Sequence, residues 1–181
     1  MNIHPAFVHF PIALLCLYVV LEIIRTKKLV VNEAFYNFKA FLAIIGTISV
    51  YVTLQTGEMA AELTRSDKSI LPILRTHSQF AEWTTNIFTV IALSYVVVLI
   101  SKYWKNRNKA QSLFSHKYFS KIWHVLEIIS GFIQKPFVIV ILALAGLIFI
   151  SITGALGGLM VYGSNADPFV HFVSQLFFGS K

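Results

Sequence analysis

Residues 4–24, HPAFVHFPIALLCLYVVLEII, decide the fold class of this chain. From Pro5 to Ile24 the segment is apolar over about 20 residues, the length that crosses the hydrocarbon core of a bilayer. Such a segment has to pair its own backbone polar groups, so it is expected to be a transmembrane helix. No Lys or Arg precedes it and no small-residue cleavage site follows, so we expect a retained helix rather than a signal peptide.

The composition of the whole chain leads to the same class. The 181 residues are 56% hydrophobic and 13% charged, and the mean hydropathy is +0.71. A soluble domain of this length could not bury that much apolar surface, so we predict an integral membrane protein. The single cysteine, Cys16, excludes an internal disulfide, a cysteine-only metal cluster and a covalently attached c-type haem.

The apolar segments predict one all-α domain over residues 1–181, a membrane four-helix bundle. The four expected spans are about 5–24, 35–54, 80–104 and 136–162. Two shorter amphipathic segments, about 117–134 and 168–178, are expected to lie in the membrane interface. For the second of these, Asp167 is the expected N-cap and Pro168 the first helical residue. No internal repeat and no soluble domain is evident.

The basic residues predict the orientation. Eleven of the fifteen fall beside the connections after the first and third spans, and four fall on the other side. The positive-inside rule therefore predicts a multi-pass protein of the bacterial cytoplasmic (inner) membrane with both termini outside. The net charge of +7 is explained by these topology determinants, so we expect no nucleic-acid partner.

Four histidines are expected at one depth, near the outer face. His4 and His9 begin the first span, His77 precedes the third, and His171 follows the fourth. Ionisable residues in membrane helices are functional candidates, and facing histidines in a four-helix bundle can hold a haem iron from both sides. We predict His9 and His77 as the pair of ligands. Small residues on the second and fourth spans would leave room for a macrocycle; they are Gly46, Ser49, Thr53, Thr56, Gly57, Ser151, Gly154 and Gly158.

Several alternatives stay open at this point. The small residues are also typical of helix packing, and the histidines could complete hydrogen bonds or relay protons. His4 could be an N-cap, and Glu82 could orient a histidine. A copper or zinc site from His4, His9, His77 and Glu82 is a further alternative, although no compact ligand motif supports it. His116 and His124 are expected on the inner side, as solvated residues.

Two motifs resemble those of a bacterial membrane-protein family, domain of unknown function 2231. They are HPAFVHFPIALL at the N-terminus and GALGGLMVYGS near residue 160. The resemblance covers residues 4–163 and implies a four-helix membrane protein in a redox setting, because some relatives are linked to haem-bearing proteins. The positions carried over by motif are His4, Pro5, His9, Pro11, His77, Gly157, Gly158 and Tyr162. The chain departs from the pattern after Tyr162 and in its basic insert at residues 105–135.

These observations predict a membrane protein that binds haem b near its outer face through His9 and His77, with His4, Gly157, Gly158 and Tyr162 at the same site. Two-histidine ligation favours an electron-transfer subunit over a stand-alone enzyme. The expected partners are a quinone and a membrane or periplasmic redox protein, besides the lipid bilayer. The alternative is a non-enzymatic scaffold or accessory subunit of a larger membrane complex. Transport is a weaker third hypothesis, because the second and fourth spans carry no acidic residue in their middles.

Overall fold

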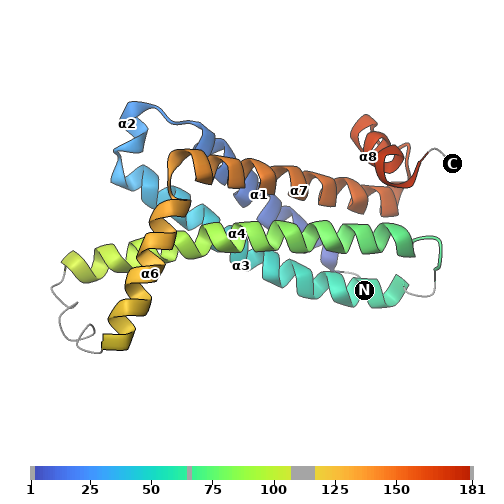
Figure 1. The fold of residues 1–181 in the computed structure, drawn as a ribbon. Coiled ribbons are helices and arrows are strands. Elements are labelled where there is room, and N and C mark those ends of the chain that lie inside the picture. Colours follow the sequence, from blue (N-terminus) through green and yellow to red (C-terminus); the bar gives the residue numbers. More distant parts are fainter. Residues whose placement is uncertain (1–2, 65–66, 107–116, 180–181) are drawn as a thin grey trace.

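The computed structural model describes residues 3–64, 67–106 and 117–179, and the regular structure of these residues is entirely helical. The all-α prediction is therefore confirmed (Figure 1). Four helices are long and apolar enough to cross a membrane. Their bounds are α1 (His4–Ile23), α3 (Glu33–Thr64), α4 (Leu71–Asn106) and α7 (Pro136–Tyr162). The shorter helices are α2 (Lys27–Val30), α6 (Lys117–Ile133) and α8 (Pro168–Phe178).

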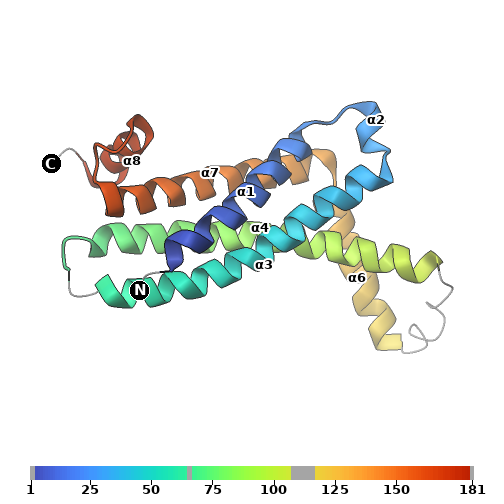
Figure 2. The same cartoon turned by 180° about the vertical axis from the view of Figure 1, so that it is seen from behind.

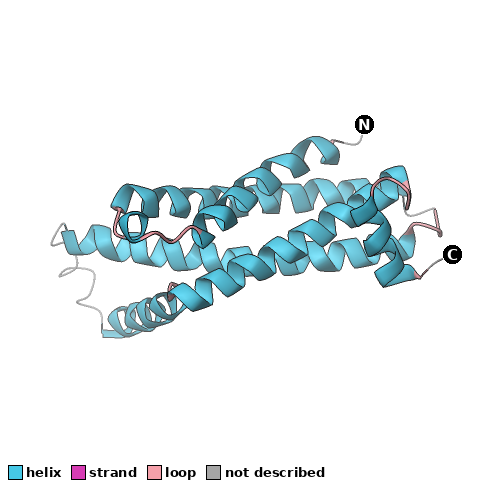
Figure 3. Cartoon of the chain, turned by 90° about the horizontal axis from the view of Figure 1, so that it is seen from above, coloured by secondary structure: helices cyan, strands magenta, loops and turns pink. Residues whose placement is uncertain are grey.

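The four long helices form two antiparallel hairpins that pack into one bundle. Helix α1 packs mainly on α3 and α4 packs mainly on α7, while α3 contacts α4 and α1 contacts α7. Helices α1 and α4 therefore lie diagonally across the bundle (Figures 1 and 2). Both chain termini lie at the same end, which we call the terminal end; the opposite end, with α2 and α6, is called the basic end. Figure 3 shows how little of the chain lies outside helices.

Helices α3 and α4 extend well past the predicted spans at the terminal end. Helix α3 continues ten residues beyond residue 54, and α4 begins nine residues before residue 80. Their 32 and 36 residues correspond to about 48 and 54 Å of helix, longer than the ~30 Å hydrocarbon core. Hydropathy identifies only the apolar part of a helix, whereas good helix formers such as those in EMAAEL, residues 58–63, continue it into the polar region.

The ends of α1 and α8 test two predicted caps. Asp167 is the N-cap of α8, and its carboxylate accepts from the backbone N–H groups of Phe169 and Val170, as expected. His4 is not a cap: α1 begins at His4 itself after Ile3, and the imidazole contacts another helix. Pro5 follows in the first turn, where its missing N–H leaves no hydrogen bond unmade.

The two short amphipathic segments form helices at opposite ends of the bundle. Helix α6 crosses the bundle at the basic end (Figure 1), with Trp123 Nε1 donating to Ser101 Oγ at 3.1 Å. Its outward residues include Ile122, Ile128 and Phe132. Helix α8 packs on the bundle through Val170 and Val173, and its exposed large side chains are Phe169, Phe172, Leu176 and Phe177.

The buried faces of α1 and α4 follow one pattern. Leu15, Tyr18 and Glu22 on α1 are buried, and so are Phe88, Ile91 and Tyr95 on α4, each 73 positions later. The matching positions carry different residues. Because the two faces differ in residue identity, the correspondence is invisible as a sequence repeat.

The second helices of the two hairpins also correspond, with an offset of 100 residues. A Cβ on Gly46 would lie 2.5 Å from Leu15 Cδ2, and a Cβ on Gly146 would lie 2.7 Å from Phe88 Cζ. Each glycine therefore receives the large side chain of the matching position on its partner helix. Helices α1–α3 and α4–α7 therefore pack through matching positions, although no internal repeat is evident in the sequence.

We predict that Gly146→Ala destabilises the protein by about 1–3 kcal/mol, because the buried Phe88 ring cannot withdraw from the new methyl group. The matched control is Gly154→Ala on the same helix, where no atom lies within 4 Å. Both changes raise helix propensity equally. Thermal unfolding in detergent measures the difference, and equal midpoints for the two variants would refute the packing role of Gly146.

Candidate functional site

His77 of α4 is held against α7 at the terminal end. Its Nδ1 lies 3.0 Å from the carbonyl oxygen of Thr153, and a Cβ on Gly157 would lie 3.5 Å from its Cε1. A carbonyl can only accept, so Nδ1–H is the donor. In the neutral ring the other nitrogen, Nε2, then carries the lone pair, the form that binds a metal ion.

His4 of α1 is held against α3 in the corresponding way. Its Nδ1 lies 3.1 Å from Thr56 Oγ1, and the Thr56 hydroxyl in turn donates to the carbonyl of Thr53 at 2.9 Å. A Cβ on Gly57 would lie 3.1 Å from its Cε1. His4 precedes His77 by 73 positions and Gly57 precedes Gly157 by 100, so the contact between an imidazole and a glycine repeats between the hairpins.

The two imidazoles share the inward faces of diagonal helices. His4 lies 11 and 14 residues before the buried Leu15 and Tyr18, a spacing that keeps residues on one helical face. His77 has the same spacing to the buried Phe88 and Ile91. The structure therefore places His4 and His77 at the same end of the bundle, on the inward faces of two diagonal helices.

His9 lies on a different face of α1. Five residues of helix turn it by about 140° from His4, and its side chain is exposed. Its Nδ1 donates to the carbonyl of Pro5, 2.8 Å away within the same helix. The sequence predicted His9 as the neighbour of His77 from its depth in the membrane alone. In the structure, the helical phase of α1 turns His4, and not His9, to the inward face.

The remaining predicted site residues do not join the two imidazoles. Gly158 packs against Val170 of α8, where a Cβ would lie 3.4 Å from the valine Cγ2, and Tyr162 is exposed. His171 is exposed and accepts from Gln175. Glu82 and His124 are also exposed, and His116 falls outside the described residues.

Several small residues of the second and fourth spans take part in helix packing or donate hydrogen bonds within their own helix. Gly46 is covered by Leu15, and Ser49, Thr53 and Ser151 donate to carbonyls of their own helices. Over residues 3–64, 67–106 and 117–179, no group of three or more His, Cys, Asp or Glu side chains is placed to hold a metal ion.

A second polar cluster, at the basic end, escaped the sequence analysis. Glu22 is 1% exposed, and its carboxylate accepts from Arg25 at 2.5 Å, from Lys39 Nζ at 2.6 Å and from Tyr95 OH at 3.0 Å. Tyr95 occupies on α4 the position of Glu22 on α1. The ion pair and the hydroxyl thus connect both hairpins at their diagonal contact.

Two features of the sequence could have revealed this cluster. Glu22 is the only charged residue of the first span, and Lys39 lies inside the second. Ionisable residues within spans are rare and are usually paired with one another. Lys39 is one of the eleven basic residues that were used only to predict the orientation, so its pairing with Glu22 was missed.

A family model described as "Predicted membrane protein (DUF2231)" matches residues 1–167. No curated protein matches the chain. No solved structure matches it either.

We predict that Glu22→Gln lowers the free energy of unfolding by about 3–5 kcal/mol, since it leaves Lys39 and Arg25 without their shared anion in a buried site. Glu33→Gln is the control, because its side chain is 75% exposed and lies 3.8 Å from Lys102, a geometry that contributes about 0–1 kcal/mol. Unfolding in detergent, followed by circular dichroism, compares the two. Similar losses would show that the buried cluster is not a major stabilising feature.

Proposed function

The chain belongs to the family of predicted membrane proteins with domain of unknown function 2231, and on that premise we propose that it is a b-type haem-binding electron-transfer protein. The observation that carries the proposal is the pair His4 and His77. They occupy matching positions on the two hairpins and face inward at one end of a multi-pass bundle that contacts the lipid bilayer.

The chemistry of His4 and His77 fits residues that would hold a haem iron. Imidazole is a common ligand of haem iron, and four-helix bundles place such ligands on facing helices. The Thr153 carbonyl fixes the tautomer of His77 with the lone pair on Nε2. Because Gly57 and Gly157 have no side chain, α3 and α7 can approach the two imidazole rings closely. His9, on the outward face, does not fit the pair.

A haem b held by two imidazoles supplies a reversible one-electron couple with no open iron position, which suits electron transfer. The residues of this chain would orient the two imidazole rings. The Nδ1–H of His77 is bound to a backbone carbonyl, an arrangement that raises the basicity of the ligating nitrogen and restrains the ring. On the other hairpin, the hydroxyl of Thr56 restrains the His4 ring through its Nδ1.

The proposal places the terminal end at the periplasmic face of a bacterial inner membrane. Support comes from the opposite end, where Arg25, Lys27, Lys28, Lys102 and Lys105 gather, as the positive-inside rule requires of a cytoplasmic face. Electrons would pass between a quinone or membrane partner and a periplasmic redox protein that reaches this end.

A dithionite-reduced minus oxidised spectrum of the purified protein tests the proposal. We expect an α-band in the wild type that falls at least tenfold in His4→Gln and His77→Gln, since each change removes a ligand. His9→Gln is the matched control and should keep the band, because His9 bonds only within its own helix.

Two results would contradict this assignment. A wild type without an α-band, prepared from haem-replete cells, would exclude the haem. A band that His9→Gln abolishes and His4→Gln retains would restore His9 and His77 as the pair and overturn the pairing proposed above.

A second candidate is a haem-free accessory subunit of a larger membrane complex. It is favoured by the interhelical bond and the glycine contact that each inward histidine makes, which a purely structural role would also explain. This candidate predicts colourless protein that co-purifies with a membrane partner. A lone, monodisperse red protein would exclude it.

A further inference from the structure

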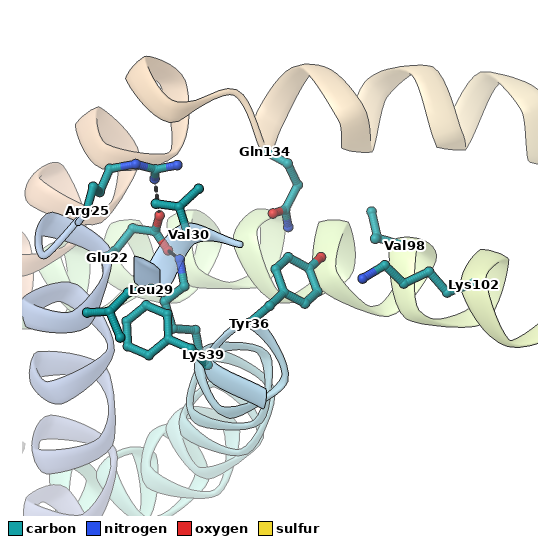
Figure 4. A pocket seen from close by; sticks show the side chains of 10 residues that line it. Glu22, Arg25, Leu29, Val30, Tyr36, Lys39, Val98, Lys102 and Gln134 are labelled. Carbon is teal, nitrogen blue, oxygen red and sulfur yellow. Dashed lines mark hydrogen bonds and ion pairs between the residues drawn. The ribbon is translucent and has the colours of Figure 1, made fainter. Parts of the chain in front are cut away.

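A cavity of about 260 Å³ opens at the basic end, beside the Glu22 cluster and far from the histidines (Figure 4). It is enclosed by α1, α2, α3, α4 and the residues that link α6 to α7. Its charged lining consists of Glu22, Arg25, Lys39 and Lys102. It is therefore a recess with charged groups on one side and apolar side chains on the other, at the basic end of the bundle.

The charges of this recess do not balance. Arg25 and Lys39 share the single carboxylate of Glu22. Within the described part of the chain, the acidic partner of Lys102 is the exposed carboxylate of Glu33, 3.8 Å away. The Nζ of Lys102 also lies 4.4 Å from the centre of the Tyr36 ring. Three cations thus line the cavity with one buried anion. Because excess positive charge in a partly buried site is costly, the recess favours a bound anion.

A polar atom faces the same space. The hydroxyl of Tyr36 is buried and makes no hydrogen bond within the described residues. Figure 4 shows it directed toward Gln134 and the ammonium group of Lys102. Gln134 is itself anchored by Nε2, which donates to Ser94 Oγ at 3.0 Å. A buried hydroxyl without a partner costs about 1–3 kcal/mol, and an anionic oxygen beside Lys102 would satisfy it.

The rest of the lining is apolar and comes from Leu29, Val30, Phe35 and Val98. The volume is below the roughly 300–1,000 Å³ of sites for drug-sized ligands, so a headgroup fits better than a whole amphiphile. Basic recesses between transmembrane helices at a membrane boundary are suited to the phosphates of lipid headgroups. We propose that this cavity binds the phosphate of an anionic lipid, whose acyl chains leave along the apolar wall.

Thermal unfolding in dodecyl maltoside, with increasing dihexanoyl phosphatidylglycerol, tests the proposal on the full chain. We expect a saturable rise of the midpoint that dihexanoyl phosphatidylcholine does not match. Lys102→Gln should weaken the apparent affinity about fivefold, the effect of one lysine at a lipid headgroup. Lys28→Gln is the matched control: Lys28 lies beside Leu29 but outside the lining, and it should keep the wild-type affinity.

Tyr36→Phe separates binding from folding. Without lipid it should unfold no earlier than the wild type, because it removes a buried hydroxyl that has no partner. With phosphatidylglycerol it should show a weaker shift. Inorganic phosphate, added alone, identifies the source of the anion: a saturable shift lost in the same variants would assign the cavity to free phosphate.

The proposal is overturned if phosphatidylcholine raises the midpoint equally, or if Lys102→Gln and Tyr36→Phe leave the phosphatidylglycerol affinity unchanged. A purely structural cluster predicts that second result. The haem spectrum does not depend on this end of the bundle, so either proposal can fail without the other.

Discussion

The bundle depends on the close approach of one large side chain to one glycine in each hairpin. Leu15 covers Gly46 between α1 and α3, and Phe88 covers Gly146 between α4 and α7. Lipid offers little hydrophobic driving force for helix association, so such close packing is what holds the spans together. It also sets their register. Eleven residues from each contact, on both helices, a histidine meets a second glycine, at Gly57 and at Gly157.

The correspondence between the two hairpins holds at one end of the bundle and fails at the other. At the terminal end the correspondence between hairpins is kept, and two imidazoles occupy matching positions. At the basic end it is broken, because Glu22 corresponds to Tyr95 and the buried Lys39 corresponds to Ile139. Equal residues at matching positions suit a ligand held from both sides, whereas unequal ones produce a charged recess on one side. The fold thus places two chemically distinct clusters, the inward histidines and the charged recess, at opposite ends of the bundle.

Much of the fold follows from the sequence, because spans, caps and amphipathic helices are local properties. Apolar length identified the four long helices, and Asp167 with Pro168 identified the start of α8. The depth of the histidines followed from topology. Which histidines share the inward face did not follow from the sequence, because choosing between His4 and His9 requires the helical phase of α1 relative to α4. Glu22 was missed for a related reason: its partners, Lys39 and Tyr95, are 17 and 73 residues away.

The central claim is that His4, and not His9, shares the mouth of the bundle with His77. It can be measured with spin labels in a Cys16→Ser background, placed on cysteines at positions 4 and 77 in one sample and at 9 and 77 in another. Continuous-wave electron paramagnetic resonance of frozen samples in lipid nanodiscs reports dipolar broadening, which increases as two labels approach. The account predicts stronger broadening for 4 and 77; equal broadening, or stronger broadening for 9 and 77, would contradict it.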